Sequence, residues 1–128
     1  YFSTWSISED SLRSLVNKKN AGEIQKISAV FDWNVKNQRP EAYQYAKKNI
    51  PDLILSTCHA KSTVIQNKTW SIAIIGSANY TANPRIETGV ITCEKIVADF
   101  HKDWILKELT GENPFNVKMN DKIKQKTN

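Results

Sequence analysis

The spacing of hydrophobic and polar positions in the first half of the chain alternates between strand-like and helix-like periods. Residues 1–6 form an apolar opening strand in this interpretation, and a helical pattern follows it until residues 20–22. Residues 24–33 are rich in β-branched and aromatic side chains and predict a second strand. A second helix is expected to begin at Pro40 and to end at Pro51. This alternation of strands and helices predicts parallel strand pairing.

The second half of the chain predicts a hairpin, a further strand and a helix. Residues 53–65 and 70–75 are extended apolar runs on either side of the polar break at 66–68, which indicates a β-hairpin. A further strand is expected over residues 86–93. Residues 94–109 predict an amphipathic helix whose apolar stripe carries Ile96, Val97, Phe100, Trp104 and Ile105. The expected fold class is α/β, with a mixed β-sheet flanked by helices.

Length and composition are those of one globular domain. The chain has 128 residues, of which 40% are hydrophobic and 24% are charged. No apolar run approaches the roughly 18 residues that a membrane-spanning helix needs, so we expect no transmembrane segment and a soluble, cytoplasmic protein. Because the sequence begins with Tyr1 inside a strand-like run, we expect residues 1–110 to be a domain truncated at its N-terminus.

The net charge of +5 favours polyanionic partners, namely nucleic acid or the headgroups of anionic lipids. Solubility alone would also account for a surplus of this size. Much of the surplus lies in residues 111–128, which we expect to form a flexible basic tail.

The two cysteines, Cys58 and Cys93, stand in apolar runs and are expected to be buried thiols in a reducing compartment. Together with His59 and His101 they offer four possible zinc ligands. They lack the paired spacing that tetrahedral zinc requires, so neither a metal nor another cofactor is expected.

The candidate chemistry lies in the predicted hairpin. His59 and Lys61 are expected inside its first strand, where alternate side chains share a face. The second strand ends in Gly-Ser-Ala-Asn over residues 76–79, and the hairpin can bring Ser77 and Asn79 close to His59. Glu87 on the next strand could then hydrogen-bond the imidazole. This set of groups suits a phosphate.

The pattern H-x-K followed by G-S-x-N resembles the signature of the phospholipase D superfamily. The residues that carry the resemblance are His59, Lys61, Gly76, Ser77 and Asn79, with Glu87 near the downstream acid of the family. Gln66 departs from the pattern, because the family has an Asp there, whose role looks more structural than chemical. The order of strands and helices is also similar to one half of that fold, which implies a phospholipase D-like α/β/α sandwich.

The resemblance, closest to the single-motif nuclease branch, implies a metal-independent phosphodiesterase. His59, oriented by Glu87, would attack phosphorus and form a covalent phosphohistidine. Lys61 and Asn79 would hold the non-bridging oxygens, with Ser77 also contacting the substrate. A second histidine would protonate the leaving oxygen. In single-motif members two copies dimerise to supply it, so we expect a homodimer, or a second motif from a missing part of the parent chain.

Two alternatives stay open beside a nuclease. One is a phospholipase D or phosphatidyltransferase that acts on phospholipid at the membrane periphery, and the other is a non-catalytic module that binds phosphate or nucleic acid.

Two further groups of residues are expected to play no part in chemistry. His101, Lys102 and Asp103 form a second His-Lys-Asp run, but they lie on a helix and are expected on its solvated face. The four tryptophans are expected in the core: Trp5, Trp33, Trp70 and Trp104. Among them Trp70, in the hairpin, is the best candidate for stacking on a base.

Overall fold

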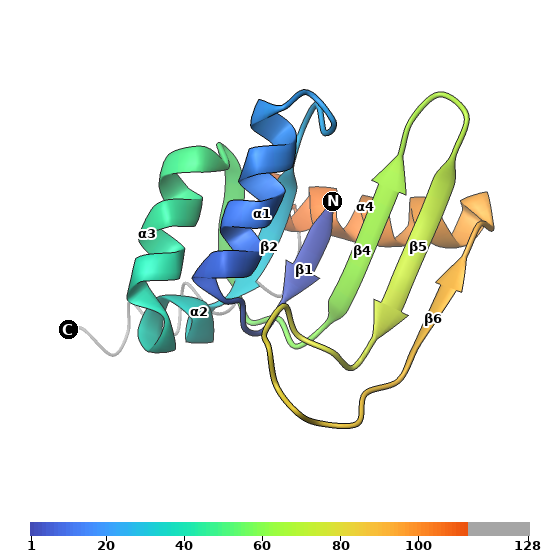
Figure 1. The fold of residues 1–128 in the computed structure, drawn as a ribbon. Coiled ribbons are helices and arrows are strands. Elements are labelled where there is room, and N and C mark those ends of the chain that lie inside the picture. The colour runs from blue at the N-terminus through green and yellow to red at the C-terminus, as the bar shows by residue number, and fades with distance from the viewer. Residues whose placement is uncertain (113–128) are drawn as a thin grey trace.

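The computed structural model describes residues 1–112, which form an α/β fold around one six-stranded mixed sheet (Figure 1). The basic tail predicted over residues 111–128 lies outside the described part from residue 113 onward. The elements are, in chain order, β1 (Phe2–Thr4), α1 (Glu9–Asn20), β2 (Ser28–Asp32), α2 (Trp33–Gln38), α3 (Pro40–Asn49), β3 (Asp52–Ser56), β4 (Lys61–Gln66), β5 (Ser71–Gly76), β6 (Gly89–Thr92) and α4 (Lys95–Thr110).

The sheet has a parallel half and an antiparallel half. Its strand order is β3-β2-β1-β4-β5-β6, with β1, β2 and β3 parallel to one another and β4, β5 and β6 joined by antiparallel pairings. The parallel pairing expected from the strand–helix alternation is therefore confirmed, and so is the hairpin, which is formed by β4 and β5. Its register places Lys61 opposite Gly76.

Helices cover both faces of the sheet. Figure 1 shows α1 and α3 in front of the parallel half and α4 behind the sheet. Side chains alternate along β2, so Ala29 and Phe31 join the core beneath α1 and α3, whereas Val30 joins Ile105 of α4 on the opposite face. These residues are fully buried, which makes β2 the strand that joins the two cores.

The helix ends explain why the elements begin and end where they do. Ser8 caps α1 by accepting a hydrogen bond from the backbone N–H of Ser11. Gly111 ends α4 in the left-handed conformation (φ 73°), which glycine adopts without strain. Pro40 opens α3 as expected. Asp32 caps the short helix α2, which the sequence analysis did not predict because it is only six residues long.

Three expectations about local structure were wrong. Residues 53–65 are two strands, β3 in the parallel half and β4 in the antiparallel half, separated by a loop over residues 57–60. Cys93 is exposed, because it lies between the edge strand β6 and α4, while Cys58 is buried as predicted. The stripe on α4 is only partly buried, since Ile96 and Phe100 are exposed.

Within residues 1–112, no helix is both long and apolar enough to cross a bilayer. In the same part of the chain, no three His, Cys, Asp or Glu side chains gather in a way that could hold a metal ion.

Candidate active site

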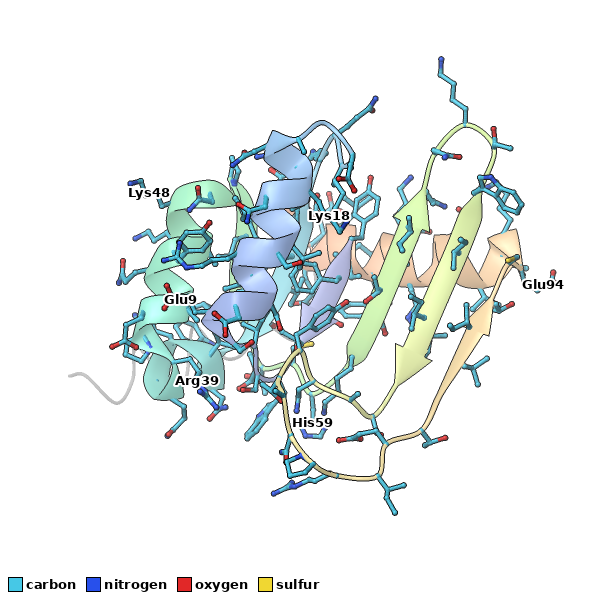
Figure 2. All side chains as sticks on the ribbon, in the orientation of Figure 1. Glu9, Lys18, Arg39, Lys48, His59 and Glu94 are labelled. Atoms are coloured by element: carbon cyan, nitrogen blue, oxygen red, sulfur yellow. The ribbon has the colours of Figure 1, made fainter. Side chains whose placement is uncertain are left out.

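A cavity of about 370 Å³ opens at the edge of the sheet where β4 begins and β5 ends. The parallel strands β1, β2 and β3 end at this same edge, which is where open α/β sheets place their ligands. Figure 2 shows His59 at this end of the molecule. The cavity is lined by His59, Ala60, Lys61, Ser62, Ile75, Gly76, Ser77 and His101.

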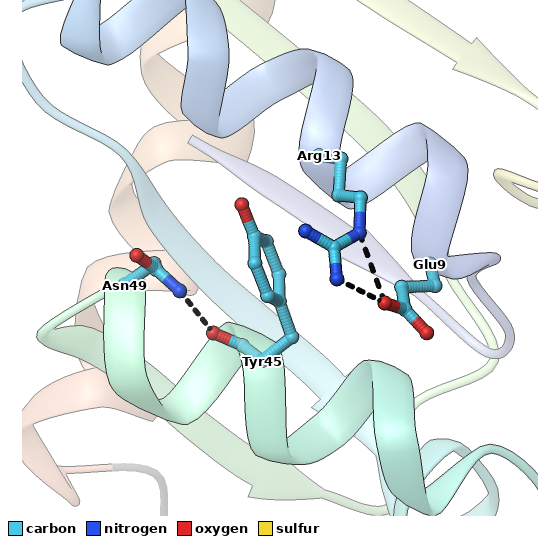
Figure 3. A network of polar contacts seen from close by, with 4 residues as sticks. All are labelled: Glu9, Arg13, Tyr45 and Asn49. Atoms are coloured by element: carbon cyan, nitrogen blue, oxygen red, sulfur yellow. Dashed lines mark hydrogen bonds and ion pairs between the residues drawn. The ribbon is translucent and has the colours of Figure 1, made fainter.

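A larger depression of about 550 Å³ lies between α1 and α3. Within it Arg13 is bonded to Glu9, and the guanidinium carbon lies 4.4 Å from the centre of the Tyr45 ring (Figure 3). Neither an imidazole nor a thiol lines it. Because Arg13 is already paired with Glu9 and no imidazole or thiol is present, the cavity at the sheet edge is the better candidate site.

His59 and Lys61 are in direct contact at the mouth of the cavity. Lys61 Nζ donates to the backbone oxygen of His59 at 2.8 Å and lies 3.0 Å from Nδ1 and 3.1 Å from Nε2 of the ring. His59 belongs to the loop that precedes β4, not to the strand as predicted, and its side chain is exposed. Burial lowers the pKa of the Lys61 ammonium. The pair therefore offers an accessible imidazole beside a cation.

Ser77 joins this cavity from the end of β5, and its hydroxyl is held by two partners. The Ser77 hydroxyl donates to the carboxylate of Glu87 and accepts from the backbone N–H of Thr88 at 3.1 Å. Glu87 was expected to bond the imidazole of His59, whereas the structure pairs this carboxylate with Ser77. The negative charge of Glu87 also acts on Lys61 and favours its charged form.

Asn79 anchors the loop that follows β5 to the segment that follows β1. Its Oδ1 accepts the backbone N–H of Ser6 at 3.1 Å, and the backbone N–H of Ser8 donates to the oxygen of Tyr80 at 2.8 Å. Asn79 does not line the cavity, although the sequence analysis expected it to hold a phosphate oxygen there. Only its amide N–H groups remain to contact a ligand.

Steric crowding explains why the motif has a glycine at Gly76. A Cβ on Gly76 would lie 2.7 Å from the backbone oxygen of Thr88, and one on Gly89 would lie 3.0 Å from the backbone oxygen of Ile75. A side chain at Gly76 would therefore collide with the backbone just before β6, and one at Gly89 would be tightly packed against β5.

Asp32, which the sequence analysis missed, fixes the loop that carries His59. Its two carboxylate oxygens accept the backbone N–H groups of Asn34 and Cys58, each at 2.8 Å. The first bond caps α2, and the second anchors the residue before His59. A sequence signal existed, since Asp directly after a buried strand is a favoured helix N-cap.

His101 also reaches the cavity, contrary to the expectation of a solvated position. Its Nδ1 lies 3.1 Å from Trp104 Nε1. An indole N–H can only donate, so Nδ1 accepts and the neutral ring carries its proton on Nε2. Burial lowers the pKa of His101. Its neighbour Asp103 is exposed, as predicted.

Gln66, the position where the family pattern has an acid, lies at the far end of β4. Lys61 and Gln66 are the first and last residues of this six-residue strand, so their backbones are about 17 Å apart at an ordinary strand rise. Gln66 Nε2 donates to Asp99 of α4 at 3.0 Å and to Ser71 at 3.2 Å. Its contacts therefore hold the hairpin against α4, away from the cavity.

Three of the four tryptophans are exposed, so the expectation of four core residues was wrong. The exposed fractions are 37% for Trp5, 44% for Trp33 and 58% for Trp70, whereas Trp104 is half-buried. The ring centres of Trp5 and His59 are 5.8 Å apart. One exposed indole therefore stands at the mouth of the cavity.

No model of a known protein family matches the chain, and no curated protein is similar to it in sequence.

Proposed function

We propose that this chain is a phosphodiesterase of the phospholipase D superfamily, most similar to its single-motif nuclease branch. The observation that carries the proposal is that His59, Lys61 and Ser77, which occupy the motif positions in the sequence, line one cavity. The mixed sheet with helices on both faces agrees with the α/β/α sandwich that the resemblance implies. An imidazole, an ammonium and a hydroxyl around one small cavity suit a phosphodiester.

In the proposed reaction, a ring nitrogen of His59 attacks phosphorus and the bond from phosphorus to the leaving oxygen breaks. The leaving oxygen takes a proton from an acid, and water then cleaves the phosphohistidine and restores the free imidazole. The ammonium of Lys61, which contacts the ring of His59, moves its hydrogen bond to a phosphate oxygen as the anion enters. The Ser77 hydroxyl, which donates to Glu87 in this structure, turns its proton to an oxygen of the same phosphate as the anion enters.

Two imidazoles are candidates for the acid. One is His59 of a second copy, or an equivalent group from a further part of the parent chain, as the resemblance implies. The other is His101 of the same chain, which lines the cavity and would act as the acid only as the imidazolium ion, a form that the bond from Trp104 and burial disfavour. Replacement of His101 by Gln distinguishes them, because it lowers turnover severely only if this chain supplies its own acid.

The test is cleavage of plasmid DNA and of a single-stranded oligonucleotide in the presence of excess chelator. His59→Ala should reduce the rate by at least about 1,000-fold, because it removes the nucleophile. Lys61→Ala should reduce it by about 100- to 1,000-fold, as the loss of a group that stabilises developing charge does. Lys68→Ala is the matched control, since it removes an exposed lysine from the opposite end of the hairpin.

The alternatives give different results in the same experiment. A lipid-cleaving enzyme would release headgroup from anionic vesicles and leave DNA intact. A non-catalytic module would bind the oligonucleotide equally well with His59→Ala and would show no turnover. Cleavage that survives His59→Ala would contradict the proposal.

A further inference from the structure

Two exposed tryptophans, Trp5 and Trp33, lie at the edge of the sheet that carries the cavity. Trp5 directly follows β1 and Trp33 directly follows β2. These strands are parallel neighbours whose last paired residues are Thr4 and Phe31, so the backbones of Trp5 and Trp33 leave the sheet at the same edge. Their exposed fractions of 37% and 44% are high for tryptophan, which is usually well buried.

The backbone beneath both rings is fixed. The amide of Asn34 donates to the backbone oxygen of Trp5 at 3.4 Å, which ties the end of β1 to α2. The capping bond of Asp32 to the backbone N–H of Asn34 holds the first turn of α2, where Trp33 lies. A second bond of Asp32, to Cys58, holds the loop of His59 against the same edge. The two indoles and the imidazole therefore project from one hydrogen-bonded frame.

The charges around this surface suit a polyanion. Lys36 Nζ lies 5.8 Å from the centre of the Trp33 ring, and Lys61 lines the cavity beside Trp5 and His59. Figure 2 shows Arg39 and His59 at the same end of the molecule. Two carboxylates lie nearby: both oxygens of Asp32 already accept backbone N–H groups, and Glu87 accepts the hydroxyl of Ser77.

We propose that Trp5 and Trp33 each stack on an unpaired base of a single-stranded nucleic acid whose phosphodiester enters the cavity of His59 and Lys61. This inference rests on the proposed function and names its substrate class. Every base presents a flat face to an indole, so the contact tolerates any sequence. In a duplex those faces are already covered by neighbouring bases, which is why an unpaired strand fits and a duplex does not. The centroid distance of 5.8 Å between Trp5 and His59 places the first stacked base next to the reacting phosphate.

Binding is measured with the His59→Ala chain, so that the oligonucleotide stays intact and turnover has no influence on the result. The probe is a fluorescein-labelled oligothymidylate, followed by anisotropy at 0.15 M salt because such affinities depend strongly on salt. Trp5→Ala and Trp33→Ala should each weaken binding by about 5- to 150-fold, the range for loss of one stacked base. Trp70→Ala is the matched control and should change the affinity less than about twofold, since its indole is exposed on the distant hairpin turn.

Trp5→Phe should keep most of the affinity that Trp5→Ala loses, because a phenyl ring also stacks, and it remains decisive if the alanine variant fails to fold by circular dichroism. A duplex of the same length should bind more weakly than the single strand. The inference is overturned if the variants of Trp5 and Trp33 bind like the Trp70 control, or if the duplex binds as tightly as the single strand. Two further results for the Trp5 and Trp33 variants would also overturn it. One is that they bind anionic vesicles more weakly but the oligonucleotide normally, and the other is that they fail to form a dimer in sedimentation. If the inference holds while chelator-resistant cleavage is absent, only the proposed catalysis fails.

Discussion

Asp32 offers the sharpest test of how the fold positions His59. Its carboxylate accepts two backbone N–H groups, one at the start of α2 and one from Cys58 in the loop before His59, each at 2.8 Å. Replacement by Ala removes a helix cap, which costs about 1 kcal/mol. It also leaves the N–H of Cys58 without its acceptor in a buried residue, which costs about 1–3 kcal/mol. The free energy of unfolding should therefore fall by about 2–4 kcal/mol.

Asp32→Asn should lose about half as much, because an amide has one oxygen and can accept only one of the two N–H groups, while Asn caps helices as well as Asp does. Urea unfolding followed by fluorescence measures both variants. With a slope of about 2 kcal/mol per molar urea, the Ala variant should unfold about 1–2 M earlier than the native chain. Asp103→Ala serves as the control, because Asp103 is exposed on α4 and should shift stability by less than about 0.5 kcal/mol. Equal midpoints for Asp32→Ala and Asp103→Ala would refute the argument.

Three further predictions concern groups around the cavity and the cysteines. The imidazole of His101 should titrate below its usual pKa of 6.5 in a proton NMR titration, because burial disfavours its charged form. Its contribution to stability should be fully present above pH 6.5 and be lost as the pH falls toward the folded-state pKa, and His101→Gln should abolish that dependence. Gly76→Ala should lower the unfolding free energy by about 1–3 kcal/mol, because its Cβ would meet the backbone oxygen of Thr88 at 2.7 Å; a midpoint equal to that of the native chain would contradict this. A thiol reagent should label the exposed Cys93 quickly and the buried Cys58 slowly, since burial also raises the pKa of Cys58; equal rates in the folded chain would show that Cys58 is accessible.

Some of the lysines lie at the C-terminal ends of helices, where they stabilise the helix and need no ligand to explain them. Lys18 and Lys19 end α1, and Lys47 and Lys48 end α3, where cations stabilise the helix dipole. Figure 2 shows Lys18 and Lys48 at the opposite end of the molecule from His59. The net charge alone therefore says little about the partner, and the cations that matter for the proposed function are those near His59.

The sequence by itself determined the types and order of the main elements. Strand and helix periods are repeated within a few residues, so they identified β1, β2, the hairpin of β4 and β5, and the helices α1, α3 and α4. The spacing of His59, Lys61, Gly76 and Ser77 likewise indicated which residues would meet, because a hairpin brings near neighbours in the sequence together. The break between β3 and β4 was missed, since apolar residues continue on both sides of it.

Only the tertiary structure decided which atoms each of these residues contacts. The strand order places β1 between β2 and β4, and this brings residues 3–6 and residues 76–80 to one edge, so that Asn79 binds Ser6. Packing of α4 behind the hairpin puts His101 into the cavity, and the parallel pairing of β1 and β2 brings the backbones of Trp5 and Trp33 to one edge of the sheet. These contacts join segments up to 73 residues apart. Local periodicity carries no information at that range, because it is burial of the whole sheet that fixes how its strands are ordered.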